Sequence, residues 1–144
     1  MQCDKYTNKY DLCDEGWIPH TVDGQKKCFY SVGRMPIEQA VESCLSRGAN
    51  LPLPKNDQAN IDTYKVVKSF GETEAALDGS DVEEEGKWVQ HSTGKKIKWS
   101  DWGGNNPNIW ADRQHYLWYW KAHPGQWDDL HGSAWAPVIC EKDA

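Results

Sequence analysis

The stretch Pro36-Ile37-Glu38-Gln39-Ala40-Val41-Glu42-Ser43-Cys44-Leu45 carries the clearest periodic signal in this chain. Its apolar side chains recur at i, i+3, i+4, i+7 and i+8, the spacing that forms one stripe along an α-helix. They are Ile37, Ala40, Val41, Cys44 and Leu45. Pro36 suits the first turn of such a helix, and Gly48 suits its C-terminal end. We therefore expect a helix here, with Cys44 facing the interior.

A hairpin is expected before this helix and a second helix after it. Asp23-Gly24 is a favoured two-residue turn pair, so residues 16–30 are predicted to form two antiparallel strands. The prolines of Leu51-Pro52-Leu53-Pro54 require an extended connector. Asn56 or Asp57 can then cap a second helix ending near Gly71. Its apolar face would carry Ile61, Tyr64 and Val67.

The remainder of the chain has no helical periodicity. Short apolar stretches alternate with Gly, Asp and Lys and predict strands; they lie at 75–77, 88–89, 97–99, 114–120, from 127 onward and at 137–140. Residues 102–114 are rich in glycine and asparagine and predict a long loop. Helices followed by short strands indicate an α+β domain. A loop longer than about 12–15 residues in a compact domain is usually functional, so the search for a site begins there.

Composition limits the classes of function. The 144 residues suit one domain. Asp and Glu number 22 against 16 Lys and Arg, a net charge of -6, which argues against a general nucleic-acid binder. The uncharged apolar runs are too short for membrane insertion. Met1 is followed by Gln2-Cys3-Asp4-Lys5 without an apolar segment, so we expect a mature form that carries no signal peptide.

The five cysteines point to an oxidising compartment. They are Cys3, Cys13, Cys28, Cys44 and Cys140, and none forms a C-x-x-C pair. Wide spacing favours two long-range disulfides and one odd thiol, and such bridges persist in secreted proteins. A cytosolic protein with five buried thiols is the alternative that composition leaves open.

A series of short motifs runs in order from Cys13 to Glu141. They are Gly16-Trp17, Cys28-Phe29-Tyr30, the helix from Glu38 to Cys44, Gly48-Ala49-Asn50-Leu51, Leu77-Asp78-Gly79, Glu85-Gly86-Lys87-Trp88, Trp99-Ser100-Asp101-Trp102, Asn106-Pro107-Asn108, Trp127-Asp128-Asp129 and Val138-Ile139-Cys140-Glu141. In order and spacing they resemble the C-type lectin-like domain. The resemblance implies a C-type lectin fold, in which two helices accompany small antiparallel sheets and a long loop that binds calcium and sugar. Residues 1–12 would be an N-terminal extension, and 13–144 the carbohydrate-recognition domain.

The resemblance also implies how the cysteines pair. Cys13 would join Cys28, and Cys44 would join Cys140. Cys3 is then the odd cysteine, available for a possible homodimer. The family usually has a further disulfide in the long-loop region, but its two positions hold Tyr116 and Gly132 here. We hypothesise that the Tyr116 ring packs over Gly132 in place of that bridge.

Five side chains match the family's calcium ligands. They are Asn106, Asn108, Gln114, Asp128 and Asp129. All bear oxygen, as a hard cation requires, but the usual three carboxylates fall to two. Asp112, in the same loop, could restore a third. The alternative is that the calcium site has decayed into a solvated polar loop.

A second calcium ion is the less favoured interpretation of the neighbouring acids. Asp81 and Glu85 match two ligands of the family's auxiliary ion, but Ile109 and His115 hold the positions that would complete it. A solvated acidic turn at Glu83-Glu84-Glu85 is therefore favoured.

Sugar is expected to bind through Asn106, Asn108 and Asp128, with Trp110 placed to stack on its apolar face. The two amides and one acid match neither the mannose-type nor the galactose-type pattern of the family. A loop anchor tucked into the domain is the alternative role for Trp110.

The leading hypothesis is a secreted, calcium-dependent lectin that binds monosaccharides on microbial or host surfaces, as in innate immunity. The alternative is a calcium-independent interaction module of the same fold. Catalysis is not expected, because His115, His123 and His131 accompany no nucleophile motif or zincin helix.

The tryptophans divide into two groups. Five match core aromatics of the family: Trp17, Trp88, Trp99, Trp102 and Trp127. Four do not, and they crowd the region of the missing disulfide: Trp110, Trp118, Trp120 and Trp135.

Overall fold

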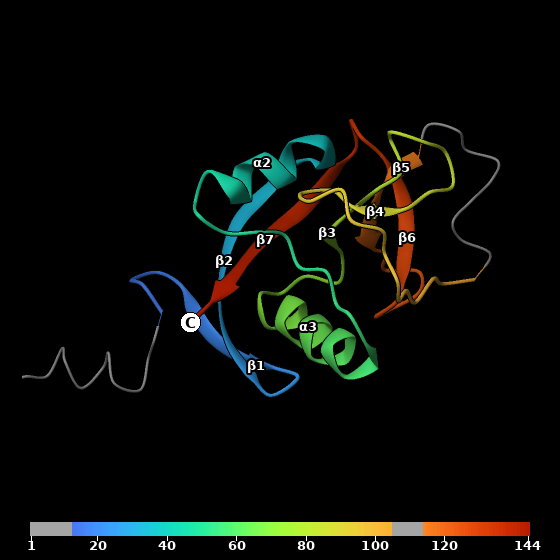
Figure 1. Cartoon of the computed structure of the whole chain (residues 1–144). Helices are drawn as coiled ribbons and strands as arrows, with labels where there is room; N and C mark the ends of the chain where they lie inside the picture. Colours follow the sequence, from blue (N-terminus) through green and yellow to red (C-terminus); the bar gives the residue numbers. More distant parts are fainter. Residues whose placement is uncertain (1–12, 105–113) are drawn as a thin grey trace, which may run out of the picture.

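The computed structural model describes residues 13–104 and 114–144, which fold around two small antiparallel sheets (Figure 1). Strand order is β1-β2-β7 in the first sheet and β4-β3-β5-β6 in the second. The strands are β1 (Ile18–Val22), β2 (Gln25–Pro36), β3 (Ala75–Ser80), β4 (Val89–Gln90), β5 (Gln114–Tyr119), β6 (Trp127–His131) and β7 (Trp135–Asp143). The helices are η1 (Ile37–Gln39), α2 (Ala40–Leu45) and α3 (Asp57–Ser69). The expected α+β class is confirmed.

The N-terminal hairpin turns where the sequence predicts. Val22 pairs with Gln25, and between them Asp23 and Gly24 have φ values of 47° and 80°. Two successive positive φ values match the twist of the strands that they join. The C-terminus lies beside this hairpin, since Ala144 N donates to Lys26 O at 3.3 Å.

The first predicted helix forms as a short 3₁₀ turn, η1, that continues into α2. The turn that follows α2 ends at Gly48, whose φ of 70° is the left-handed conformation that glycine adopts readily. Ile37, Ala40 and Cys44 are buried as expected. Leu45 is 43% exposed, because it is the last residue of α2 and lies at the end of the apolar stripe.

The second predicted helix is α3, and Asn56 is its N-cap. Asn56 Oδ1 accepts a hydrogen bond from Ala59 N at 2.8 Å, which satisfies one of the free donors at the start of the helix. Tyr64 and Val67 are buried, but Ile61 is 50% exposed, so its assignment to the apolar face was wrong. Asn60, one residue earlier, is the side chain that faces inward, at 4% exposure.

The second sheet contains most of the predicted late strands. Residues 97–99 are an exception: they form no strand, and the nearest pairing is an isolated bridge between Val89 and Lys96. Residues 94–100 instead run as irregular chain, in which Ile97 packs inward against the core.

Two hydrophobic clusters make up the core, and most of the tryptophans belong to them. Trp127 is fully buried in the first cluster, with Trp88, Trp99 and Trp102 packed against it; Trp17 packs against the second. Trp118, which matches no core aromatic of the family, is only 7% exposed within the second cluster. It occupies an inward position on β5, which forms pairs on both of its edges.

Both predicted disulfides are present, Cys13–Cys28 and Cys44–Cys140. They close loops with sequence separations of 15 and 96 residues. In the chain-entropy model these bridges stabilise the fold by about 3 and about 4–5 kcal/mol. The longer one joins α2 to the central part of β7, two segments that lie 96 residues apart in the chain. Cys3 lies outside the described residues.

The Tyr116 ring lies against Gly132, as hypothesised. A Cβ built on Gly132 would meet Tyr116 Cε1 at 2.9 Å, a distance that real Cβ contacts do not show. Tyr116 is half-buried and packs on the second core cluster. The Tyr116 ring can therefore occupy this position only because Gly132 has no side chain.

A double-mutant cycle tests this packing. Gly132→Ala is expected to destabilise the protein by about 1–3 kcal/mol, because the new methyl group would meet both Tyr116 Cε1 and Glu38 Oε1 at 2.9 Å. In a Tyr116→Ala background the same change should cost less, giving a coupling energy of about 1 kcal/mol. Urea unfolding of the four proteins measures it. Equal costs of Gly132→Ala in both backgrounds would show that the two residues are energetically independent.

Candidate functional site

Acidic side chains gather where β3 ends beside the start of β5. Asp81 directly follows β3 and is 1% exposed, and His115 is the second residue of β5. Asp81 N donates to His115 O at 3.0 Å, and His115 Nδ1 lies 2.9 Å from Asp81 Oδ1. Asp81 Oδ2 accepts from Gly86 N at 2.8 Å. These bonds hold a buried carboxylate in one orientation.

Glu85 completes this group from the turn after Asp81. Its Oε1 lies 3.6 Å from His115 Nδ1, and ligand atoms of Asp81, Glu85 and His115 all lie within 4.8 Å of one another. Partial loss of hydration and the charges of Asp81 and Asp129 raise the pKa of Glu85. The turn is exposed as expected, but Glu85 is not simply solvated: it belongs to a cluster that could hold a metal ion.

Asp128 and Asp129 form the second half of the site, on β6. Asp129 is 2% exposed, Asp128 is half-buried, and Asp129 N donates to Asp128 Oδ1 at 2.8 Å. Burial and a side-chain hydrogen bond with Asp129 raise the pKa of Asp128 to about 7. Burial and the nearby Asp129 carboxylate both disfavour the charged form of Asp128, and a positive charge beside the pair would favour it.

The structure describes three of the five predicted calcium ligands. Asp128 and Asp129 are brought together, whereas Gln114 opens β5 opposite His131. Asp128 pairs with Trp118, so the backbones of Gln114 and Asp128 are roughly 10 Å apart. The side chains of Gln114 and Asp128 can bind one ion only if they approach it from opposite sides. Asn106, Asn108, Asp112 and Trp110 lie outside the described residues.

A buried amide that the sequence analysis missed supports this site from behind. Asn60 Oδ1 accepts from Trp127 Nε1 at 3.0 Å and from Tyr119 Oη at 2.6 Å. Asn60 Nδ2 donates to Gly125 O at 2.8 Å and to Asp101 Oδ2 at 3.3 Å. Trp127 directly precedes Asp128, so Asn60 fixes the strand that carries the acids. Its spacing from Tyr64 and Val67, i+4 and i+7, was the available signal.

The three histidines near the predicted site do not form a catalytic group. His115 belongs to the acidic cluster, whereas the His123 ring lies 5.5 Å from the Trp120 ring and against Gly103. His131 is exposed at the end of β6. Nothing in this arrangement pairs a nucleophile with a base.

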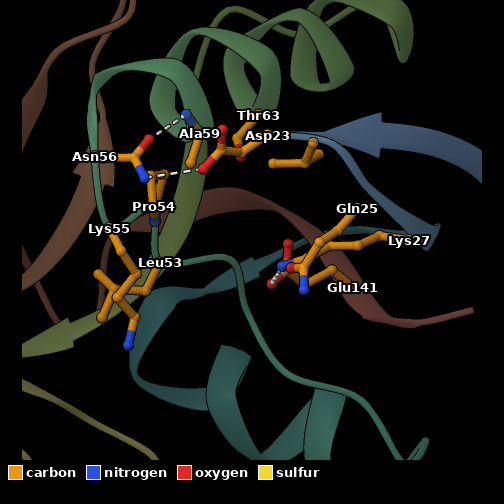
Figure 2. Close-up of a pocket in the computed structure, with 11 residues that line it drawn as sticks. Asp23, Gln25, Lys27, Leu53, Pro54, Lys55, Asn56, Ala59, Thr63 and Glu141 are labelled. Atoms are coloured by element: carbon orange, nitrogen blue, oxygen red, sulfur yellow. Dashed lines mark hydrogen bonds and ion pairs between the residues drawn. The ribbon is translucent and has the colours of Figure 1, made fainter.

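A separate hollow of about 400 Å³ lies between the β1–β2 hairpin and the start of α3 (Figure 2). The ion pair between Lys27 Nζ and Glu141 Oε2, at 3.0 Å, closes one side of it. On the other side, Asn56 Nδ2 donates to Asp23 Oδ2 at 2.9 Å. These polar groups already satisfy one another, so they stabilise the join between hairpin and helix.

Chemically, the acidic end of the second sheet is suited to cations. Calcium takes six to eight oxygen ligands from carboxylates, amides and water. Asp128 and Asp129 offer carboxylates already held in place, and Gln114 offers an amide oxygen. The Asp81–Glu85–His115 group adds an imidazole nitrogen, a ligand that softer divalent metals prefer.

Comparison with known proteins gives a consistent result. The Lectin C-type domain model matches residues 33–142. Salivary C-type lectin 2 of Aedes albopictus is 27% identical over 108 residues, which cover 70% of this chain and 68% of the relative. The mouse scavenger receptor C-type lectin carbohydrate-recognition domain has the same fold, with TM-score 0.75, 22% identity and coverage of 91% and 96% of the two chains. A calcium-independent type II antifreeze protein superposes with TM-score 0.76, 26% identity and coverage of 92% and 95%.

Removal of the buried amide is expected to be costly. Asn60→Ala leaves Trp127 Nε1 without its acceptor in a dry environment, and should lower the free energy of unfolding by about 2–4 kcal/mol. The matched control is Asn56→Ala on the same helix, where loss of the cap costs about 1 kcal/mol. Urea unfolding compares the two variants. If Asn60→Ala cost no more than Asn56→Ala, the support given to β6 by the amide would be unimportant.

Proposed function

The chain belongs to the C-type lectin domain family, and from this premise we propose that it is a secreted lectin that binds monosaccharides through a calcium ion. Members of the family are carbohydrate-binding domains, not enzymes. The proposed recognition domain comprises residues 13–144, with 1–12 as an extension. The family match itself spans 33–142.

The pair of carboxylates on β6 is the observation that carries the proposal. Asp128 and Asp129 are packed together with restricted access to water, and the pKa of Asp128 is raised to about 7 by burial and by its neighbour. Keeping Asp128 charged is costly in the absence of a cation, and a divalent ion beside the pair would favour its ionised form. We propose that Asn106, Asn108 and Gln114 supply the remaining protein ligands.

The negative charge of the neighbouring acidic cluster supports the same proposal, because it attracts cations to this end of the sheet. Asp81 and Glu85 add negative charge near Asp129. Charge of one sign in a partly buried region raises the local concentration of cations. This chain has one carboxylate ligand fewer than is usual in the family. The charges of Asp81 and Glu85 partly compensate for it without coordinating the ion.

Sugar recognition would follow from the polarity of the ligands. The calcium ion, when bound, supplies coordination to two vicinal hydroxyl groups. Asp128 would accept a hydrogen bond from one hydroxyl, and the amides of Asn106 and Asn108 would donate to the other. Trp110 is the proposed stacking partner for the apolar face of the sugar. Terminal monosaccharides on microbial or host glycans are the expected class of ligand.

Secretion is proposed on two grounds. The relative from Aedes albopictus is a salivary lectin, and the two disulfides require an oxidising compartment. No helix in 13–104 or 114–144 combines the length and apolar character needed to cross a bilayer. A homodimer through Cys3 would give bivalent binding to surface glycans, which raises avidity.

The second candidate is a calcium-independent interaction module. It is favoured by the reduced number of carboxylates and by the structural likeness to a calcium-independent type II antifreeze protein. Trp135, at 61% exposure, is a large apolar side chain available to a partner.

Calcium binding is expected to be measurable and weak. A Kd of about 0.1–1 mM is typical of extracellular calcium modules. About 10 mM calcium should then stabilise the protein by about 1.4–2.7 kcal/mol relative to chelator. The double variant Asp128→Asn/Asp129→Asn should lose this stabilisation. The control Glu15→Gln/Glu42→Gln removes the same two charges at exposed positions and should keep it. Calorimetry and thermal unfolding check both, and equal stabilisation of the two variants would locate the ion elsewhere.

Glycan binding separates the two candidate functions. On an array of immobilised glycans we expect binding in calcium that is abolished by chelator and competed by simple sugars. The Asp128→Asn/Asp129→Asn variant should bind no better than the chelated protein. Binding that is unchanged in chelator and insensitive to monosaccharides would favour the calcium-independent module.

A further inference from the structure

Lysines are unevenly distributed over this acidic protein. Lys87 and Lys96 line a hollow of about 470 Å³, and Lys55, Lys95, Lys96 and Lys98 line an adjacent hollow of about 320 Å³. The two hollows share Lys96 and Ile97, so they are continuous across this short stretch of chain. We call this region the lysine surface, defined by Lys55, Lys87, Lys95, Lys96 and Lys98.

The lysine surface is not neutralised by the protein itself. No Asp or Glu lines either hollow, although the whole chain carries a net charge of -6. All five lysines are exposed. Lys87 pairs with Glu84 at 3.0 Å, but none of the other four enters an ion pair within the described part of the chain. The four exposed lysines without an acidic partner give this surface a local positive charge that attracts anions.

Tryptophans line the same hollows. Trp88 and Trp102 contribute to the larger one, where their rings meet edge to face with centroids 5.0 Å apart. Trp99 contributes to the smaller one. A flat aromatic side chain beside cationic groups suits a ring that has an apolar face and negatively charged substituents.

We propose that the lysine surface is a binding site for a linear sulfated polysaccharide. The partly exposed tryptophans in the hollows would contact a pyranose ring while the sulfates of the sugar meet the lysines. Two hollows that share Lys96 suit consecutive sugars of one polymer better than a single small anion. Single-stranded nucleic acid is a competing polyanion, and tighter binding of it would count against this assignment.

This site is independent of the proposed calcium site. None of Gln114, Asp128 and Asp129 lines either hollow. Binding to the lysine surface should therefore survive chelation of calcium, and its failure would leave the proposed monosaccharide function untouched.

The test is calorimetry of the full chain with a heparin oligosaccharide, in chelator, at salt concentrations between about 50 and 200 mM. Lys95→Gln/Lys96→Gln/Lys98→Gln should weaken binding at least about tenfold. The slope of log K against log salt should also fall by about one per lysine removed. The matched control is Lys26→Gln/Lys65→Gln/Lys121→Gln, three exposed lysines outside both hollows, and it should retain the affinity of the parent protein.

Three comparison ligands complete the experiment: desulfated heparin of the same length, phosphatidylserine vesicles and a single-stranded oligonucleotide. We expect each to bind more weakly than heparin. Equal or tighter binding of any of them would overturn the assignment to sulfated polysaccharide. The proposal is also overturned if heparin fails to bind in chelator, or if the control variant loses as much affinity as the lysine variant. Far-ultraviolet circular dichroism and cooperative thermal unfolding equal to those of the parent protein show that both variants are folded.

Discussion

One buried side chain, Asn60, joins the helix α3 to the sheet that carries the acidic site. Its amide uses both of its polar ends, accepting from Trp127 and Tyr119 and donating to Gly125 and Asp101. An amide so enclosed is tolerable only because every group that it faces is satisfied. The network fixes the position of β6 relative to α3, and therefore the place at which the following carboxylates emerge.

The region beyond β6 is held by packing of the Tyr116 ring against Gly132. This packing supplies contact area but no covalent constraint, so the chain from β5 to Gly132 depends on non-covalent contacts. Asp81 provides one such link: its backbone and side chain both bond to His115. The acidic cluster thus has a structural role in the protein alone, alongside any role with a cation.

Local signals in the sequence were sufficient for much of the fold. Asp23-Gly24 specified the hairpin, and the stripe from Ile37 to Cys44 specified the first helix, because both depend on residues close together in the chain. Exposure of Leu45 and burial of Trp118 could not be read in this way, since each depends on which distant element packs there. The meeting of Asp81, Glu85 and His115 likewise depends on strand register across 34 residues. Of the predicted calcium ligands, only the adjacent pair Asp128 and Asp129 was certain to lie together.

The closeness of the two described ends of the domain has a practical consequence. Cys13 is bonded to Cys28 on β2, and the terminal Ala144 bonds to Lys26 two residues away on the same strand. Both ends therefore leave the domain at one pole, on the side opposite β5 and β6 (Figure 1). A fusion partner or surface linker attached at either end would present the acidic end of the second sheet outward in the same orientation. The domain is consequently well suited to display in ordered arrays.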